Sequence, residues 1–258
     1  MSDMVRVQAQ EGITLLTLDI PKTRNALSQE VLALLAGHLE ALAGAADCAA
    51  IVLTGAGGHF CSGGDVSGMK EERTLPMART RMMLGHRVIR NIIGGPKPVI
   101  AAVEGYAAGA GLSLAAACDY VVSSSTARYI SSFAKVGLLP DMGLLWTLPQ
   151  RIGLPEAKRM FATTRVVESS EAKQLGLVDQ VVEPGRVLQT AIEIARGFTA
   201  GAPLATALMK AIYASGCATL EDALRSERDN QGGLYLTQDH RQAVAAFLEK
   251  RSPAFRGF

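Results

Sequence analysis

The chain has 258 residues, of which 48% are hydrophobic and 19% charged, and its formal net charge is +2. A chain of this length can bury a substantial core, in one large domain or two small ones. Acidic and basic residues are interspersed without a basic stripe, so we expect no nucleic-acid partner. No apolar run reaches about eighteen residues, and residues 1–10 lack the apolar centre of a signal peptide, so we expect a cytoplasmic protein that does not enter a membrane.

The cysteines and histidines carry no metal-binding pattern. The four cysteines lie far apart, and neither a C-x-x-C pair nor an H-x-x-x-H spacing is present. Zinc sites and redox dithiols depend on such spacings. We therefore expect reduced thiols and no metal site.

The chain opens with a predicted hairpin and a helix. Residues 5–9 and 13–18 are short β-rich runs separated by Glu11-Gly12, which is typical of an antiparallel turn. Ser28 then precedes an apolar-periodic segment, residues 31–42, with Glu30 in its first turn. A serine before such a segment predicts a helix with its N-cap at Ser28.

Strands and helices alternate in the middle of the chain. Residues 51–54, 99–103 and 120–122 are compact apolar runs that predict buried strands, and two of them end at glycine-containing turns. Beyond residue 201 the pattern is wholly helical, over residues 204–215, 220–231 and 240–250. We therefore expect a mixed α/β core over residues 1–200 and a helical C-terminal region over residues 201–258.

The first segment with chemical content follows a predicted buried strand. Residues 57–65 read GGHFCSGGD. Glycines let a backbone approach a ligand closely and turn its N–H groups inward, as an oxyanion hole requires. A purely structural turn explains such a run equally well.

The second segment joins a strand to a helix. Residues 105–119 read GYAAGAGLSLAAACD, with small residues first and good helix formers after them. Ala110 is therefore expected at a helix N-terminus, where free N–H groups and the helix dipole favour negative charge. Tight helix packing is the alternative explanation for the small residues.

Five motifs in this order resemble the enoyl-CoA hydratase/isomerase (crotonase) family from end to end. They are residues 21–27 (PKTRNAL), 61–65 (CSGGD), 105–119, 136–141 (VGLLPD) and 245–251 (AAFLEKR). The resemblance implies a ββα spiral core and an acyl-CoA thioester substrate, with coenzyme A as part of the substrate and no separate cofactor. It places the two oxyanion N–H donors at Gly64 and Ala110. Each such donor is worth about 3 to 4 kcal/mol of transition-state stabilisation.

The resemblance also implies where coenzyme A binds. Its adenine and phosphates would lie against Arg24, Ala26, Ser62 and Gly64, and a guanidinium suits phosphate geometry. Phe247 and Lys250 would approach the coenzyme of the same or a neighbouring subunit. A solvated turn is the alternative for Arg24, core packing for Phe247 and a solvated face for Lys250.

Hydratases of this family use two glutamates that flank a water, and the sequence lacks both. The corresponding positions hold Ser113 and Phe133. Without paired carboxylates, water cannot be activated by that mechanism, which disfavours simple hydration.

Asp141 remains as the candidate acid/base. A subgroup of the family, the epoxyphenylacetyl-CoA isomerases of phenylacetate degradation, carries its catalytic aspartate here, and the alternative is an Asx turn or an N-cap before Leu144. A working base would need an apolar surround that raises its pKa, and we expect Phe133, Leu138, Leu144 and Trp146 to provide it. The chain departs from the subgroup at Leu144-Leu145, where smaller residues are usual.

The resemblance leaves three functions open. The leading one is an acyl-CoA isomerase that shifts a double bond or rearranges an epoxide with Asp141, and the others are a hydratase or related hydro-lyase and a non-catalytic acyl-CoA-binding protein. Four methionines, Met69, Met77, Met82 and Met83, lie where relatives cover the acyl pocket, although core filling is the simpler account of each. A homotrimer or a dimer of trimers is implied, with the C-terminal helices in the interface.

Overall fold

The computed structural model describes residues 4–65 and 74–257. Strands β1 (Val5–Gln10) and β2 (Ile13–Leu18) form the predicted antiparallel hairpin. Glu11 and Gly12 both have positive φ angles, 49° and 80°. Two central residues of that kind make a tight turn whose twist matches the strands.

The hairpin is one edge of a six-stranded sheet of order β1-β2-β3-β4-β6-β9. From β2 onwards every neighbouring pair is parallel. The added strands are β3 (Ala50–Gly55), β4 (Val99–Val103), β6 (Tyr120–Ser124) and β9 (Gln180–Val182). Strands 50–55 and 99–103 are almost fully buried, as their continuous apolar character predicts.

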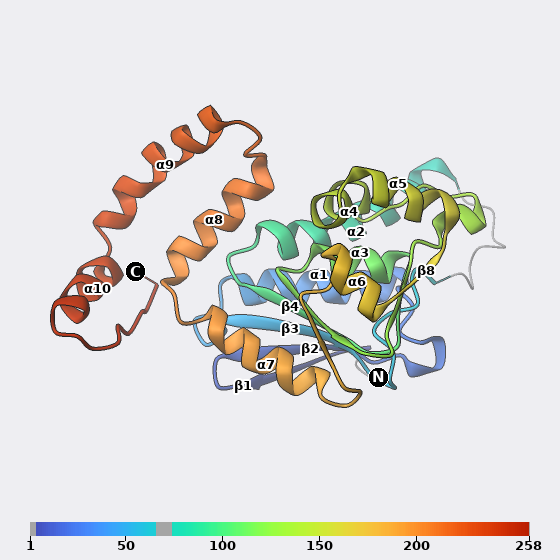
Figure 1. Cartoon of the computed structure of the whole chain (residues 1–258), viewed down its shortest axis with the longest axis horizontal. Coiled ribbons are helices and arrows are strands. Elements are labelled where there is room, and N and C mark those ends of the chain that lie inside the picture. Colours follow the sequence, from blue (N-terminus) through green and yellow to red (C-terminus); the bar gives the residue numbers. More distant parts are fainter. Residues whose placement is uncertain (1–3, 66–73, 258) are drawn as a thin grey trace.

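Helices cover both faces of this sheet (Figure 1). Helix α1 (Gln29–Ala43) buries Val31, Leu32 and Leu35 in the larger core, together with Ile92 from α2 (Leu75–Gly94). Ser28 caps α1 as predicted, since its side chain accepts a hydrogen bond from the Val31 N–H at 3.2 Å. The opposite face of the sheet packs against α7 (Val187–Phe198), in a smaller apolar cluster.

A second, three-stranded sheet packs through β5 against helix α3 (Ala110–Ala117), every residue of which is buried. Its strands are β5 (Tyr106–Ala108), β7 (Arg128–Ile130) and β8 (Val166–Glu168). The remaining elements of this layer are η1 (Pro21–Thr23), η3 (Phe133–Val136), α4 (Leu144–Ile152), α5 (Leu154–Thr163) and α6 (Ser169–Leu175).

Three helices form a C-terminal arm that extends away from the sheets (Figure 1). They are α8 (Pro203–Ser215), α9 (Leu220–Tyr235) and α10 (Gln238–Leu248). The ammonium of Lys210 on α8 is buried, donates to the Ile92 carbonyl at 2.9 Å and pairs with Asp119 at the start of β6. This buried pair fixes the base of the arm to the core.

The prediction of a mixed α/β architecture is confirmed, with helices only beyond residue 201 among the described residues. The short strands β5, β7 and β8 were not predicted, because three residues carry too little periodicity to identify. Helix α9 continues to Tyr235, past the predicted end at Gln231 and through Gly232 and Gly233. No helix in the described parts of the chain has the length and apolar character that crossing a membrane requires.

The Lys210 to Asp119 pair predicts a large loss of stability when its cation is removed. Substitution Lys210→Met should lower the free energy of unfolding by about 3 kcal/mol, because it leaves a carboxylate and a carbonyl without their buried donor. Urea denaturation at one fixed protein concentration measures the change. The matched control is Lys158→Met, on the exposed side of α5, and equal stability of the two variants would contradict the role of the pair.

Candidate active site

The two glycine-containing segments lie against each other. Cys61 pairs with Ala107 as in a parallel strand, because its N–H donates to the Tyr106 carbonyl at 2.9 Å and its carbonyl accepts from the Ala108 N–H at 3.0 Å. A methyl group added to Gly111 would lie 2.3 Å from the Cys61 carbonyl oxygen. The glycine there is required by the close approach of two backbones.

The peptide between Gly63 and Gly64 is oriented by the segment on its other side. The Leu27 N–H donates to the Gly63 carbonyl at 2.8 Å, and the Asp65 N–H donates to the Leu27 carbonyl at 3.0 Å. In a trans peptide the C=O and the next N–H point in opposite directions. The Gly64 N–H therefore points away from Leu27, on the side where the second segment lies.

Ala110 is the first residue of α3, directly beside this peptide. A methyl group added to Gly63 would lie 2.9 Å from the Ala108 carbonyl oxygen and 3.7 Å from the Ala110 nitrogen. The first N–H groups of a helix have no partner within the helix, and they carry the positive end of its dipole. The structure thus brings Gly64 and Ala110 together, with Gly109 between strand and helix at a φ of 52°.

The two positions where hydratases of the family carry glutamates also lie here. The Ser113 hydroxyl is buried in α3 and donates to the Asp141 carbonyl oxygen at 3.0 Å. The Phe133 side chain is buried too, and its Cζ lies 4.0 Å from where a methyl group on Gly109 would be. A hydroxyl that is already hydrogen-bonded and a phenyl ring occupy the places of the two acids.

Asp141 begins a tight turn that is packed onto α2. The Leu144 N–H donates to the Asp141 carbonyl at 3.1 Å, across Met142 and Gly143, whose φ angles are 49° and 75°. Met142 is buried, and a methyl group added to Gly85 on α2 would lie 2.9 Å from its Cγ. A left-handed methionine costs free energy and persists only where packing enforces it. The turn is therefore held in place by α2 and α3.

The alternative explanation of Asp141 as a helix cap is wrong. The N-cap of α4 is Gly143, and no side-chain hydrogen bond caps that helix. The Oδ1 atom of Asp141 is buried and has no hydrogen-bond partner among the described residues. A buried carboxylate oxygen without a partner is costly, and a catalytic role is one explanation for it.

Burial raises the pKa of the Asp141 carboxyl above its ordinary range, while the nearby charges of Arg81 and His86 on α2 act against that rise. The predicted direction of the shift agrees with the structure. Of the residues expected to surround the carboxyl, Phe133 and Leu144 are buried, whereas Leu138 and Trp146 are half exposed. The pKa of Asp141 is therefore raised by burial between packed helices and turns, and less by a ring of large apolar side chains.

Sequence reasoning missed Arg81 and His86, which lie far from Asp141 along the chain. A signal for Arg81 was present, since it shares a helical face with Gly85, Val88 and Ile92, at spacings of four, seven and eleven residues. Those three residues are buried. A charged residue on the same helical face as buried residues is expected to face the interior of the protein, and Arg81 is such a residue.

The segment expected to bind coenzyme A lies against the first glycine segment. The Ser62 N–H donates to the Arg24 carbonyl at 2.9 Å, and the Ser62 hydroxyl donates to the Thr23 carbonyl at 2.8 Å. The exposed Arg24 guanidinium lies 5.9 Å from the centre of the Tyr106 ring. Ala26 adjoins them, and its N–H donates to the Thr23 hydroxyl at 3.3 Å. Arg24, Ala26 and Ser62 therefore form one surface beside Gly64.

Phe247 and Lys250 lie elsewhere, on and just after α10 in the C-terminal arm. Phe247 is 82% exposed, so the core-packing explanation of this residue is wrong for the single chain. The core-filling explanation is also wrong for Met77 and Met83 on α2, whose side chains are 52% and 66% exposed. Met69 lies outside the described residues.

Cys61, the cysteine in the first glycine segment, is not suited to act as a nucleophile. Cys61 is fully buried, and burial raises its pKa to about 12, as it does for Cys118. A thiolate is therefore not available beside the glycine segment. Within residues 4–65 and 74–257 no three histidine, cysteine or acidic side chains are grouped so that they could hold a metal ion.

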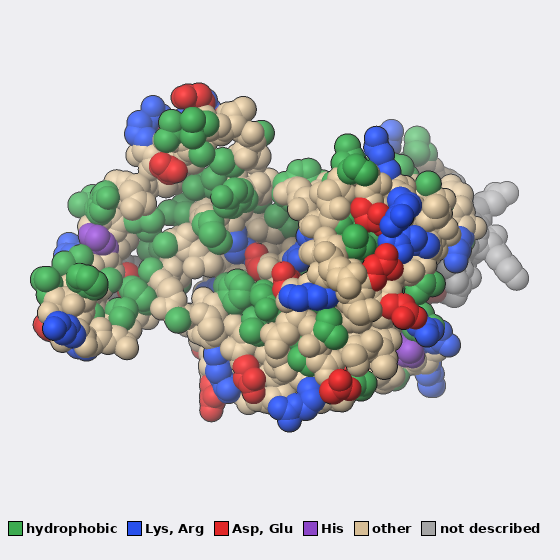
Figure 2. All heavy atoms as spheres, in the orientation of Figure 1, with side chains coloured by type: hydrophobic (Ala, Val, Ile, Leu, Met, Phe, Trp, Pro, Cys, Tyr) green, Lys and Arg blue, Asp and Glu red, His purple; other side chains and the backbone are tan. Residues whose placement is uncertain are grey.

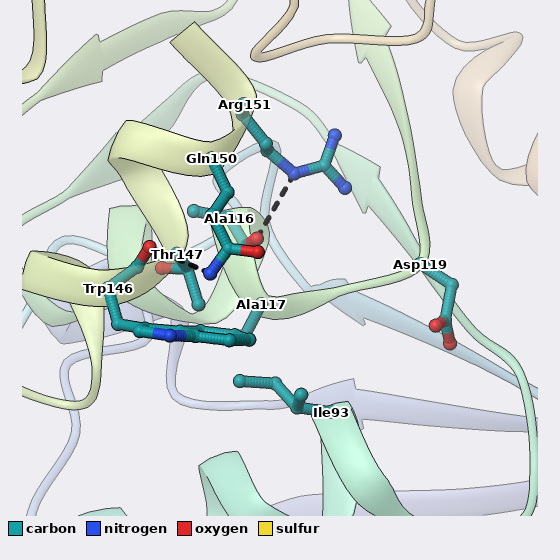
Figure 3. A pocket seen from close by; sticks show the side chains of 8 residues that line it. All are labelled: Ile93, Ala116, Ala117, Asp119, Trp146, Thr147, Gln150 and Arg151. Atoms are coloured by element: carbon teal, nitrogen blue, oxygen red, sulfur yellow. Dashed lines mark hydrogen bonds between the residues drawn. The ribbon is translucent and has the colours of Figure 1, made fainter. Parts of the chain in front are cut away.

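A separate hollow lies between the ends of α2, α3 and α4 (Figure 3). The Trp146 ring extends along it beside Ile93 and Ala117, and Arg151 donates to the Ala116 carbonyl at 3.1 Å. Asp141 is not among its lining residues. Trp146 therefore lines a hollow that Asp141 does not line.

Comparison with known proteins identifies the class of protein. The sequence profile of the enoyl-CoA hydratase/isomerase family matches residues 8–257. The chain belongs to this family. It is 34% identical to a short-chain-enoyl-CoA hydratase of Clostridium acetobutylicum, over 96% of this chain and 95% of the relative. It is 33% identical to a 1,2-epoxyphenylacetyl-CoA isomerase of Escherichia coli K12, with both chains covered completely.

Solved structures of enoyl-CoA hydratases have the same fold. One from Polaromonas sp. JS666 has a TM-score of 0.90 and 34% identity, over 97% of this chain and 99% of the other. One from Bacillus anthracis has a TM-score of 0.92 and 30% identity, over 98% and 99%. The predicted crotonase-type spiral core is confirmed.

Proposed function

We propose that the chain is an acyl-CoA isomerase that shifts a double bond, or rearranges an epoxide, through a thioester enolate. Membership of the enoyl-CoA hydratase/isomerase family supports an acyl-CoA substrate. The carboxylates around the two glycine segments are the observation that favours isomerisation over hydration. Asp141 is present, with a buried Oδ1 atom, while the two hydratase positions hold Ser113 and Phe133.

In the proposed reaction the thioester oxygen accepts hydrogen bonds from the Gly64 and Ala110 N–H groups. Asp141 removes a proton from the α-carbon, so that the electron pair of the C–H bond moves onto the thioester as an enolate. The two amides stabilise the negative oxygen because they are already oriented toward it. The protonated Asp141 then delivers the proton to a more distant carbon of the acyl chain, and the double bond moves without addition of water.

A single base suffices for this proton transfer, whereas hydration also needs a group that activates water. Hydration remains the second candidate, because several relatives bear hydratase names. It would require an acid from outside the two family positions. A protein that only binds acyl-CoA would retain the same surface without proton exchange at the α-carbon.

Arg24, Ala26 and Ser62 are proposed to hold the adenine and phosphates of coenzyme A beside Gly64. The exposed guanidinium of Arg24 supplies the charge that phosphate oxygens require. Phe247 and Lys250 are proposed to approach the coenzyme of a neighbouring subunit, since the arm that carries them extends away from its own core (Figure 1).

Substitution Asp141→Asn tests the assignment of the base. The isomerisation rate should fall by at least about a hundredfold, because an amide cannot accept the proton. The Ser113 hydrogen bond uses the backbone of residue 141 and is retained. Proton NMR of a panel of acyl-CoA esters in heavy water reports α-proton exchange, double-bond migration and hydration together.

The control for this variant is Asp47→Asn, which neutralises an exposed aspartate. In the wild type kcat/KM should decline on the acid side at a higher pH than an ordinary aspartate would give, since the base works only when deprotonated and burial raises its pKa. Full activity of Asp141→Asn would remove the assignment. Hydration of crotonyl-CoA without isomerisation would favour the hydratase.

The exposed apolar side chains of the C-terminal arm indicate that chains associate with one another. Large apolar side chains gather over it in Figure 2, and the most exposed are Tyr213, Leu220, Leu236, Phe247 and Leu248. Such extended apolar surfaces mark protein interfaces. We therefore propose a homotrimer or a dimer of trimers. Light scattering after gel filtration should give three or six times the chain mass of 27.2 kDa, and a monomer would contradict the proposal.

A further inference from the structure

Arg81, on α2, lies against the first glycine segment. Its guanidinium Nη2 donates to the Leu27 carbonyl at 3.3 Å. A methyl group added to Gly64 would lie 2.9 Å from the same Nη2 atom. The guanidinium therefore lies directly on Gly64, whose N–H is a proposed donor to the thioester oxygen.

Arg81 also lies on the side of α2 that packs against the turn of Asp141, because Gly85, one helical turn further along α2, lies against Met142. Among the described residues, the charges that favour ionised Asp141 are those of Arg81 and His86, both from α2, while α3 contributes the uncharged Ser113 hydroxyl to the backbone of the turn. Arg81 is half buried, whereas His86 is exposed. An ionic interaction is weaker where water surrounds one of the charges. Arg81 is therefore the stronger of the two countercharges.

We propose that Arg81 is a positioning residue of the active site, a fixed countercharge for negative charge that moves between Asp141 and the thioester oxygen. The inference rests on the proposed function. Before proton transfer the negative charge is on the Asp141 carboxylate. When the C–H bond breaks, the proton neutralises Asp141 and the electron pair places the charge on the oxygen beside Gly64. Arg81 contacts Gly64 and, from the face of α2 that also carries Gly85, favours the charged form of Asp141, so its interaction with the negative charge is favourable before and after the proton moves.

The Leu27 hydrogen bond explains how Arg81 can act without moving. One guanidinium nitrogen is held by a backbone carbonyl, and a guanidinium has five N–H groups in a rigid plane. The carbonyl itself is fixed, because it also accepts the Asp65 N–H. A preoriented charge needs no reorganisation when the enolate forms, which is the condition for effective electrostatic stabilisation.

The test compares Arg81→Met with Arg79→Met, which removes an exposed arginine from the same helix. Both are made in a His86→Gln background, because a histidine ordinarily changes its charge in the pH range to be scanned. The measurement is the pH dependence of kcat/KM for α-proton exchange. In Arg81→Met, the fall of kcat/KM on the acid side (the acid limb of the pH profile) should move to a pH higher by about one unit. The reason is that Asp141 loses the cation that favours its charged form. On the alkaline plateau it should also lower kcat at least about tenfold.

Arg81→Lys should retain the position of the acid limb, because it keeps the charge. If Arg81→Met does not fold, Arg81→Gln carries the same two expectations. An acid limb and a kcat identical to those of Arg79→Met would overturn the inference, and so would a loss of rate without any shift of the limb, which is what a merely structural role predicts. Absence of exchange in the wild-type chain with every ester would instead contradict the proposed function.

Discussion

The orientation of one peptide, between Gly63 and Gly64, is the constraint on which the rest of the site depends. Leu27 binds the Gly63 carbonyl on one side, and the Ala108 to Ala110 backbone approaches Gly63 on the other. An added methyl group at Gly63 would lie 2.9 Å from a backbone oxygen, so the contact requires glycine. The sheet, the hairpin and the buried helix α3 all serve to place this peptide beside the first amide of a helix.

Two opposing effects determine the charge of Asp141 in the site. Burial favours the neutral form of Asp141, while the half-buried Arg81 favours the ionised form. A base whose two forms are close in free energy can both take and return a proton, as an isomerase requires. The same guanidinium donates to the Leu27 carbonyl, which also accepts the Asp65 N–H beside the Gly63 to Gly64 peptide.

Features determined by neighbouring residues could mostly be predicted from the sequence. Pairings between segments far apart in the chain mostly could not. Continuous apolar runs predicted β3 and β4, and Ser28 predicted the start of α1, because each signal lies within a few residues. The family resemblance supplied Gly64, Ala110 and Asp141 as site residues. Arg81 could not be paired with Asp141 from the sequence, since sixty residues separate them and only the packing of α2 on the turn joins them.

The most direct test of the account is the rate of α-proton exchange by Ala110→Pro. Ala110 is the first residue of α3, where proline fits a helix and replaces the N–H group with a ring carbon. The account predicts a fall in kcat of roughly 10² to 10³-fold, with a thermal midpoint close to that of Ala110→Ser, which keeps the amide. A folded Ala110→Pro protein with the full rate of exchange would contradict it.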